Sequence, residues 1–359
     1  MASELRLGTR GSQLAMWQAT TVAARIAAAG GPPCRIVVIK TTGDRLHDAP
    51  LSEVGGKRLF VKEIEDALLR GEIDLAVHSS KDMPAMLPDG LTIAAVLPRE
   101  DPLDAVVLPV RLRPDTTADA HPRRNMDAAA EGPASANDSS VVSGFSRTVS
   151  SIEDLVALLG QAPSIGTSSV RRIAQLTRLI PGARFTPIRG NLDTRLRKLD
   201  DGAHDALVLA AAGLRRLGFA DRISLALPPE ACVPAPGQGI VAVEIRSDAA
   251  EVREVVGRID DSDAAAALVA ERALVETLGG GCQTPIGALA TSRDGNRIDL
   301  VAAVVALDGS KAVRGRGEAP RAEAATLGAR IGAQLIADGA DQILAAAARA
   351  HGAVEGIQP

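Results

Sequence analysis

One cysteine of the chain stands in a turn that suits covalent attachment of a bulky group. Cys282 follows three glycines and precedes Pro285 in the run GGGCQTPIG (279–287). Glycines let a ligand approach the main chain, and the proline restricts the backbone that leaves the turn. A small buried cysteine in a tight loop would have the same local sequence. The thiol is therefore a candidate attachment point, and the rest of the sequence must decide its role.

The chain changes from apolar to polar where a strand is predicted to end. In the run AVHSSKDMP (76–84), the polar residues begin at His78 and include Lys81 and Asp82. Because ligands of open α/β sheets lie at the carboxyl ends of strands, these side chains are candidates for ligand binding. A solvated Lys–Asp pair in a turn and a structural histidine are the alternative interpretations.

Two predicted helices have arginines close to their N-termini, in the runs GTSSVRRIAQL (166–176) and RGNLDTRLRKL (189–199). The N-terminus of a helix attracts anions, and guanidinium groups there act against the helix dipole. An anionic ligand would offset this unfavourable placement. Solubilising surface arginines are the alternative, which we favour for Arg197 and Lys198. The candidates for anion binding are Arg171, Arg172, Arg189 and Arg195.

Further charged residues lie at similar positions nearer the N-terminus. Arg10 follows the first predicted strand and precedes a helix that Ser12 can cap, and Asp44 lies in TTGDR (41–45). Lys57 lies in the glycine-rich run GGKRLFVKEIE (55–65), which has neither the Walker nor the GxGxxG spacing. Arginine binds carboxylates through charged hydrogen bonds that contribute about 1.5–3 kcal/mol each. Together with the exposed cysteine, these residues predict a cleft for a ligand with many carboxylates.

Strands alternate with helices along most of the chain, which predicts right-handed βαβ units and a mostly parallel sheet. The segment 111–150 breaks this pattern and is predicted to be a flexible insertion, and the proline-rich segment 227–239 is predicted to be a hinge or crossing. The predicted strands are 4–9, 35–41, 74–79, 91–97, 104–108, near 164, 184–189, 205–210, 240–246, 286–291, 297–307 and 311–316. The predicted helices are 12–28, 60–70, 151–159, 169–180, 191–200, 211–217, 249–258, 262–277 and 320–350.

The composition limits the class of protein. With 359 residues, 46% hydrophobic and 23% charged, the chain is expected to form two or three globular domains. One Trp, four Phe and no Tyr argue against base-stacking surfaces, and the net charge of −4 gives no overall attraction to nucleic acid or membrane. Three cysteines without a CxxC spacing exclude a disulfide framework and a cysteine-rich zinc site. No signal peptide or membrane span is predicted, so we expect a cytoplasmic protein.

Ten segments, in order along the chain, resemble the hydroxymethylbilane synthase family, also called the porphobilinogen deaminase family. The resemblance implies a transferase of tetrapyrrole and heme biosynthesis that joins four porphobilinogen molecules head to tail, releases ammonia at each step and then frees hydroxymethylbilane by hydrolysis. The family works on a dipyrromethane cofactor bound through a thioether, and Cys282 occupies the attachment position. The segments are TRGSQLAMWQA, TTGDR, GGKRLFVKE, AVHSSKDMP, EDPLDAVV, GTSSVRR, RGNLDTRL, LAAAGLRRLG, PAPGQG and GGGCQTPIG.

The same resemblance implies roles for individual residues. Asp82 matches the catalytic residue, whose carboxylate holds pyrrole N–H groups and stabilises the azafulvenium cation formed when the aminomethyl group leaves. Lys57, Arg58 and Phe60 match a mobile loop over the cleft, and Arg58 stands where the family usually has glycine. The residues that match cofactor-binding or substrate-binding positions are Arg10, Ser12, Asp44, Lys81, Asp82, Thr167, Ser169, Arg171, Arg172, Arg189, Arg195 and Gln238.

The fold that the resemblance implies has three α/β domains. Two resemble the lobes of type II periplasmic binding proteins, and a smaller C-terminal domain carries the cofactor cysteine. The predicted limits are 1–100 with 239–258 for domain 1, 101–238 for domain 2 and 259–359 for domain 3. We expect a monomer that binds porphobilinogen but no metal, nucleic acid or membrane, and that hands its product to the next pathway enzyme. A non-catalytic two-lobed binding protein for a small carboxylate anion and an inactive homologue stay open as alternatives.

Overall fold

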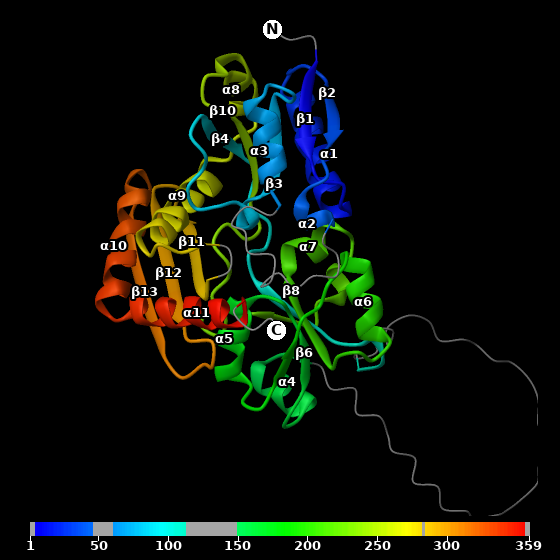
Figure 1. Ribbon diagram of the computed structural model, residues 1–359, viewed down its shortest axis with the longest axis vertical. Coiled ribbons are helices and arrows are strands. Elements are labelled where there is room, and N and C mark those ends of the chain that lie inside the picture. Colours follow the sequence, from blue (N-terminus) through cyan, green and yellow to red (C-terminus); the bar gives the residue numbers. More distant parts are fainter. Residues whose placement is uncertain (1–3, 46–59, 113–148, 282–283, 356–359) are drawn as a thin grey trace, which may run out of the picture.

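The computed structural model describes residues 4–45, 60–112, 149–281 and 284–355 (Figure 1). These residues form three α/β units, which we call the first lobe, the second lobe and the third domain. Figure 1 shows the first lobe above the second lobe, with the third domain to the left of both. None of the described helices combines the length and the hydropathy needed to cross a bilayer.

The first lobe is a five-stranded sheet with helices on both faces. Apolar side chains of α1 and α8 pack on one face of this sheet, and those of α3 pack on the other. The strand order is β2-β1-β3-β10-β4. Its strands are β1 (Leu5–Thr9), β2 (Cys34–Val38), β3 (Leu75–Ser79), β4 (Leu91–Val96) and β10 (Val241–Arg246), and its helices are α1 (Gln13–Ala28), α2 (Thr42–Arg45), α3 (Lys62–Leu69) and α8 (Ala250–Gly257).

The second lobe repeats this architecture. Its strand order is β7-β6-β8-β5-β9, with α4 and α5 on one face and α6 and α7 on the other. A short 3-10 turn, Val110–Leu112, follows β5. The strands are β5 (Asp104–Val107), β6 (Ser164–Gly166), β7 (Arg184–Thr186), β8 (Ala206–Ala210) and β9 (Leu225–Leu227), and the helices are α4 (Ile152–Leu159), α5 (Val170–Leu179), α6 (Leu192–Asp200) and α7 (Ala211–Arg216).

The prediction of a mostly parallel sheet is confirmed, because four of the five strands in each five-stranded sheet run in one direction and a single strand runs against them. β10 runs antiparallel to both β3 and β4, and β5 runs antiparallel to both β8 and β9. The physical reason is that the chain crosses between the lobes twice. β5 follows the outward crossing (97–103) and β10 follows the return crossing (228–240), so each enters its sheet from the opposite end. The domain limits proposed from the sequence stay a prediction.

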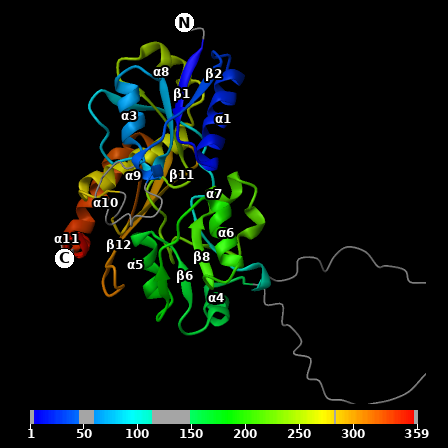
Figure 2. The ribbon, with the colours of Figure 1, turned by 45° about the vertical axis from the view of Figure 1, so that its right-hand side comes forward.

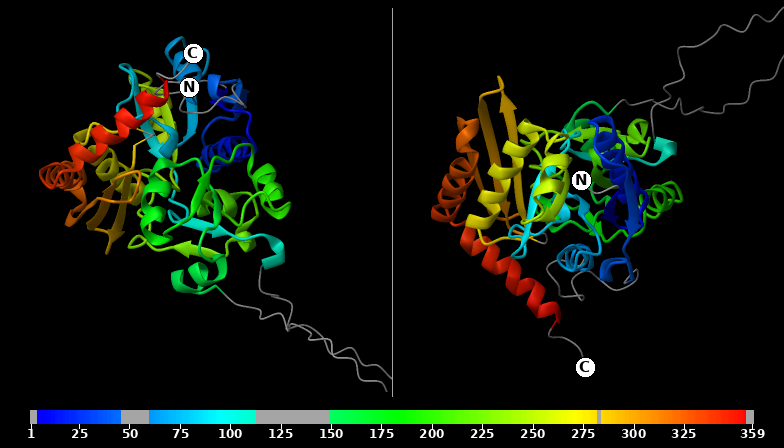
Figure 3. Two further views of the ribbon diagram at one scale, coloured as in Figure 1. Left: turned by 60° about the horizontal axis from the view of Figure 1, so that its bottom comes forward. Right: turned by 90° about the horizontal axis from the view of Figure 1, so that it is seen from above.

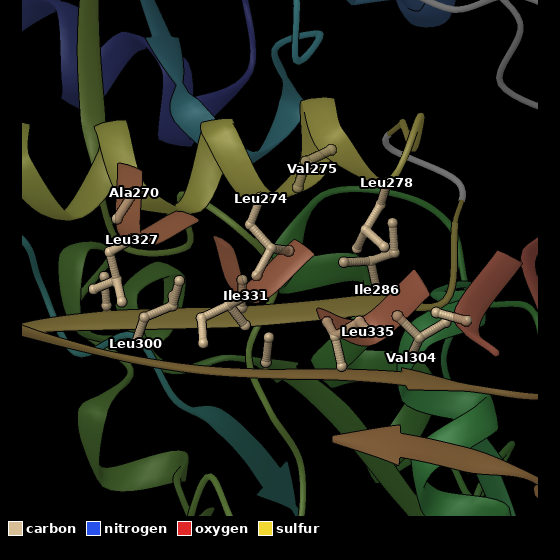
Figure 4. Packing of buried hydrophobic residues seen from close by; sticks show 14 of the residues in the cluster. Ala270, Leu274, Val275, Leu278, Ile286, Leu300, Val304, Leu327, Ile331 and Leu335 are labelled. Carbon is tan, nitrogen blue, oxygen red and sulfur yellow. The ribbon is translucent and has the colours of Figure 1, made fainter. Parts of the chain in front are cut away.

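The third domain is a three-stranded antiparallel sheet with a helical layer. Figure 4 shows side chains of α9, α10 and the sheet converging in its core, among them Leu274, Leu327 and Leu300. Gly328 lets α10 approach α9 closely, because a Cβ at that position would lie 2.1 Å from the carbonyl oxygen of Ala270. The strands are β11 (Ile286–Arg293), β12 (Arg297–Val305) and β13 (Ala312–Pro320), and the helices are α9 (Ser262–Thr277), α10 (Ala324–Ala337) and α11 (Ala340–Glu355).

A buried carboxylate on α9 joins the third domain to both crossings. Glu271 is fully buried, and it accepts hydrogen bonds from Arg99 Nη1 at 2.6 Å, from the backbone N–H of Gly237 at 2.6 Å and from that of Ala290 at 2.7 Å. Arg99 belongs to the outward crossing and Gly237 to the return crossing. Figure 3 shows α9 beside the first lobe, with the three-stranded sheet set to one side. Glu271 therefore fixes where the third domain sits.

We expect Glu271→Gln to lower the free energy of unfolding by about 3 kcal/mol, because the Arg99 guanidinium, whose side chain is only 12% exposed, would lose its counter-charge. Chemical denaturation followed by circular dichroism measures this loss. Glu276→Gln, on the same helix but exposed, is the matched control and should change stability by less than about 0.5 kcal/mol. Equal stabilities of the two variants would show that Glu271 does not hold the junction together.

Candidate active site

The two lobes and the third domain enclose a cavity of about 80 Å3 at their junction. Figures 1 and 2 show α9 and β11 beside this junction. Gly281, which directly precedes Cys282, is one of the lining residues, so the predicted attachment loop begins at the cavity wall. Cys282 itself lies outside the described residues. The other lining residues include Ser80, Lys81 and Met83 from the first lobe, Ser169 and Arg171 from the second, Pro236 from the return crossing, and Leu268, Arg272, Thr284 and Ile286 from the third domain.

The predicted ligand-binding turn after β3 reaches this junction. Residues Ser80–Asp82 form a 3-10 turn, and the Ser80 backbone N–H donates to the Ile240 carbonyl at 3.0 Å, which ties the turn to the return crossing. Lys81 and Asp82 are both half-buried. Burial lowers the pKa of Lys81 to about 8, although the charge of Asp82 acts in the opposite direction. No hydrogen bond to the Asp82 carboxylate occurs within the described part of the chain, so this group is available to a ligand.

The low pKa of Lys81 predicts a pH-dependent stability. The pKa is about 8 in the folded chain and 10.5 as a reference value, so the unfolded chain binds more protons between these values. Stability is therefore full above pH 10.5 and is lost as the pH falls towards 8. We expect Lys81→Met to raise the Tm by a few degrees at pH 7 and to have less effect as the pH rises from 8 to 10. Thermal unfolding across this range is the measurement.

Lys198→Met, at an exposed position of α6, is the control and should leave the pH profile unchanged. A gain in Tm for Lys81→Met that stays constant with pH would mean that the ammonium group does not titrate near pH 8.

The arginines at the start of α5 have a partner that the sequence did not reveal. Asp104 is fully buried, and its carboxylate accepts from Arg171 Nη1 at 2.6 Å and from Arg172 Nε at 2.9 Å. The side-chain amide of Gln238 donates to the same carboxylate at 3.0 Å. Burial raises the pKa of Asp104, but the charges of the two arginines outweigh this and hold the pKa far below its usual range. The negative charge that was expected to offset the two guanidiniums therefore comes in part from Asp104 and not only from a ligand.

The other two candidate arginines of the second lobe retain more freedom. Arg195 is half-buried, and its Nε donates to the Gly190 carbonyl at 2.9 Å. Burial lowers the pKa of Arg195, as does the charge of Arg172, while Asp82 acts in the opposite direction. Arg189 is half-buried, and among the described residues no group forms a hydrogen bond with its side chain. Both guanidiniums can therefore still bind an anion.

The side chain of Arg10 binds to groups of the first lobe. Its Nε donates to Asp44 at 3.1 Å, and its guanidinium lies 4.4 Å from the centre of the Phe60 ring. Burial raises the pKa of Asp44, but the hydrogen bond and charge of Arg10 outweigh it and lower the pKa below its ordinary value. Ser12 caps α1 by accepting from the Ala15 N–H, as the sequence predicted. Asp44 therefore orients Arg10 in this structure.

The hydroxyl groups at the start of α5 hold the loop that precedes it. Ser169 is the N-cap of α5, and its hydroxyl accepts from the Arg172 N–H at 3.5 Å. Thr167 is buried, and its hydroxyl accepts from the Ser169 N–H at 3.3 Å. These contacts fix the first turn of α5 and with it the position of Arg171.

The junction brings together Lys81, Ser169 and Arg171 around one cavity. Arg10 contacts Asp44 and Phe60 instead, and none of the three is among the lining residues of the cavity. Lys57 and Arg58 lie outside the described residues, so their predicted loop is not placed. Sequence reasoning missed Asp104 and Ser80. The run EDPLDAVV places Asp104 at the start of a predicted strand, but no local pattern indicates that its side chain is buried.

The fold and the site together define a three-unit α/β protein with a cationic cavity at the junction of its lobes. Family models agree with this class: "Porphobilinogen deaminase, dipyromethane cofactor binding domain" matches residues 5–254, and "Porphobilinogen deaminase, C-terminal domain" matches residues 265–337. The chain belongs to the porphobilinogen deaminase family.

Relatives over the full length support this membership. The chain is 41% identical to a porphobilinogen deaminase of Syntrophobacter fumaroxidans, over 95% of this chain and 96% of that one. It is also 41% identical to one of Pelotomaculum thermopropionicum, over 96% and 97%. Among solved structures, the Bordetella pertussis BvgS periplasmic VFT2 domain matches with a TM-score of 0.36 and 15% identity, over 72% of this chain and 86% of that one.

The residues around the cavity fit the dipyrromethane cofactor of the family. Two buried polar atoms at the cavity, Ser80 Oγ and Arg171 Nε, have no hydrogen-bond partner within the described chain. A buried polar group without a partner is costly, and carboxylate groups of a cofactor are suitable partners for donors of this kind. Lys81 adds a positive charge to the same wall. The donor set therefore suits a ligand with several carboxylates, held beside the loop that contains Cys282.

Proposed function

We propose that this chain is a hydroxymethylbilane synthase. It condenses four porphobilinogen molecules head to tail, releases ammonia at each step and frees hydroxymethylbilane by hydrolysis. Family membership supports this activity. The observation that carries it is the cationic cavity at the lobe junction, lined by Lys81 and Arg171 and reached by Gly281. Cys282, the next residue, is the attachment point of the dipyrromethane.

The bound dipyrromethane supplies the pyrrole carbon at which the chain of rings grows. Asp82 accepts hydrogen bonds from pyrrole N–H groups and offsets the positive charge that develops on the incoming ring as its amine leaves. The turn after β3 carries Asp82, and its neighbour Lys81 lines the junction cavity. Partial burial of Asp82 strengthens both of its interactions because little water screens them.

Arginines bind the acetate and propionate arms. Arg189 and Arg195 carry guanidiniums that the protein leaves largely available, and each can form a bidentate pair with a carboxylate. Arg171 lines the cavity, and its Nε has no partner within the described chain. The remaining residues of the proposed binding set are Arg10, Ser12, Asp44, Thr167, Ser169, Arg172 and Gln238. Lys57, Arg58 and Phe60 form the proposed loop over the cleft.

The enzyme works as a cytoplasmic monomer and passes its product to the next enzyme of the pathway; these features follow from the family resemblance and form part of the proposal. The activity is tested by incubating the purified protein with porphobilinogen and measuring substrate loss and ammonia together. We expect equal amounts of each and a linear tetrapyrrole product. A non-catalytic binding protein would bind a carboxylate anion and consume nothing, and an inactive homologue would fold without turnover.

A further inference from the structure

A single buried carboxylate faces two buried guanidiniums at the base of the binding site. Asp104 is the first residue of β5 and is fully buried. The side chains of Arg171 and Arg172 are only 4% and 10% exposed, and both form ion pairs with Asp104, at 2.6 and 2.8 Å. One negative charge therefore balances two positive charges in this cluster. A surplus positive charge remains buried, where it is costly unless an anion joins it.

The other groups around Asp104 do not remove this surplus. Gln238 is neutral and donates to the carboxylate at 3.0 Å. The Cys232 thiol also donates to it, at 3.3 Å, and burial followed by the charge of Asp104 raises the pKa of this thiol to about 12. The thiol therefore stays protonated and contributes no charge. The nearby Lys81 and Arg195 are cationic, and only Asp82 among these neighbours is an acid.

The hydrogen bonds of Asp104 use some donor atoms of Arg171 and leave another one without a partner. It accepts from both Nη atoms of Arg171 but leaves Nε buried and without a partner within the described chain. Arg171 lines the junction cavity. Asp104 and the Val233 carbonyl thus bind the Nη atoms of Arg171, and its Nε remains without a partner within the described chain.

We propose that Asp104 is a positioning residue that acts as an internal counter-anion: it orients Arg171 and Arg172, neutralises half of their charge and leaves the rest for a ligand carboxylate. This inference rests on the proposed function in one respect only, which is that the ligand carboxylate belongs to the cofactor or the substrate. Asp104 also accepts a hydrogen bond from Gln238 of the return crossing. The charged cluster is therefore bonded directly to the segment that joins the lobes.

The test uses citrate as the anion and the full-length chain with Cys282→Ser, which removes any covalent cofactor from the comparison. Adding Asp104→Asn to this parent should lower the Tm by about 10 °C in anion-free buffer, because two buried guanidiniums lose their counter-charge. Citrate should then raise the Tm of the Asp104→Asn protein at least about twice as much as that of the parent, since binding to the folded state stabilises it.

Asp101→Asn is the matched control. Asp101 lies in the outward crossing, and its ion pair with the half-exposed Arg215 at 3.1 Å does not reach the cluster. This variant should lose little Tm and show the citrate response of the parent. Equal citrate responses in Asp104→Asn and the parent would overturn the proposal and leave Asp104 a purely structural residue.

A double variant covers the case in which Asp104→Asn does not fold. Asp104→Asn with Arg172→Gln removes one charge of each sign and keeps the net charge of the cluster. We expect it to recover about half of the lost Tm and to lose the enhanced citrate response. A double variant no more stable than Asp104→Asn alone would contradict the counter-anion role. These outcomes do not depend on turnover, so failure of the proposed activity would be seen separately, as porphobilinogen that is not consumed.

Discussion

Cys282→Ser is expected to give a protein without a covalent cofactor and with less than about 1% of wild-type turnover. Serine lacks the thiolate nucleophile that forms the thioether, and a ligand with four carboxylates cannot otherwise be held permanently in place. Intact-mass measurement of the wild-type protein should show an increment of two pyrrole units, and the variant should show the bare chain mass. Turnover of porphobilinogen is measured in parallel on both proteins.

Cys34→Ser is the matched control for this experiment. Cys34 is the first residue of β2, is half-buried and lies on the outer edge of the first lobe sheet, away from the junction. It should keep both the increment and the activity. An increment that persists in Cys282→Ser, or wild-type protein that is active with an unmodified mass, would remove the basis of the proposed function.

Asp82→Asn is expected to reduce turnover by on the order of 100-fold or more, with little change in stability. The amide keeps the size of the side chain but removes the negative charge that offsets the cationic ring, and such electrostatic groups are worth about 3–4 kcal/mol in a sheltered site. The Asp82 carboxylate forms no hydrogen bond within the described chain, so its loss breaks no internal contact. Single-turnover kinetics with porphobilinogen should show the slow step directly.

Asp89→Asn tests whether any nearby charge has the same effect. Asp89 is exposed in the loop that leads from this turn to β4. Its replacement should leave turnover within a factor of about two, as expected for a solvated surface charge. Unchanged turnover in Asp82→Asn would exclude its catalytic role, and a large loss of folding stability would show that the carboxylate supports the turn instead.

Local sequence patterns predicted most of the helices and strands, because capping residues and the spacing of apolar residues act over a few positions. The start of α1 followed from a serine that can cap it, and α9 was predicted at 262–277 from helical periodicity, as the structure has it. The strand β9 was missed. The direction of β5 and β10 depends on the path between lobes, and no local pattern encodes such a path.

The sequence predicted the positive charges of the candidate site but not the groups with which they pair. Helix N-termini pointed to Arg171 and Arg172, yet their partner Asp104 lies 67 residues from Arg171 in the sequence and meets it only through the fold. The Ser80 hydroxyl, which has no hydrogen-bond partner among the described residues, likewise gave no local signal, because its burial depends on the return crossing that packs beside it. Contacts of this kind require the tertiary structure.

The place of β10 between β3 and β4 has a consequence for synthesis of the chain. The ribosome releases β3 and β4 long before β10, so the middle of the first sheet stays open until residue 246 has emerged. The second lobe, whose strands and helices are contiguous from β5 to β9, can fold during that interval. The nascent N-terminal half meanwhile exposes two unpaired strand edges, the feature that makes chains aggregate or recruit chaperones.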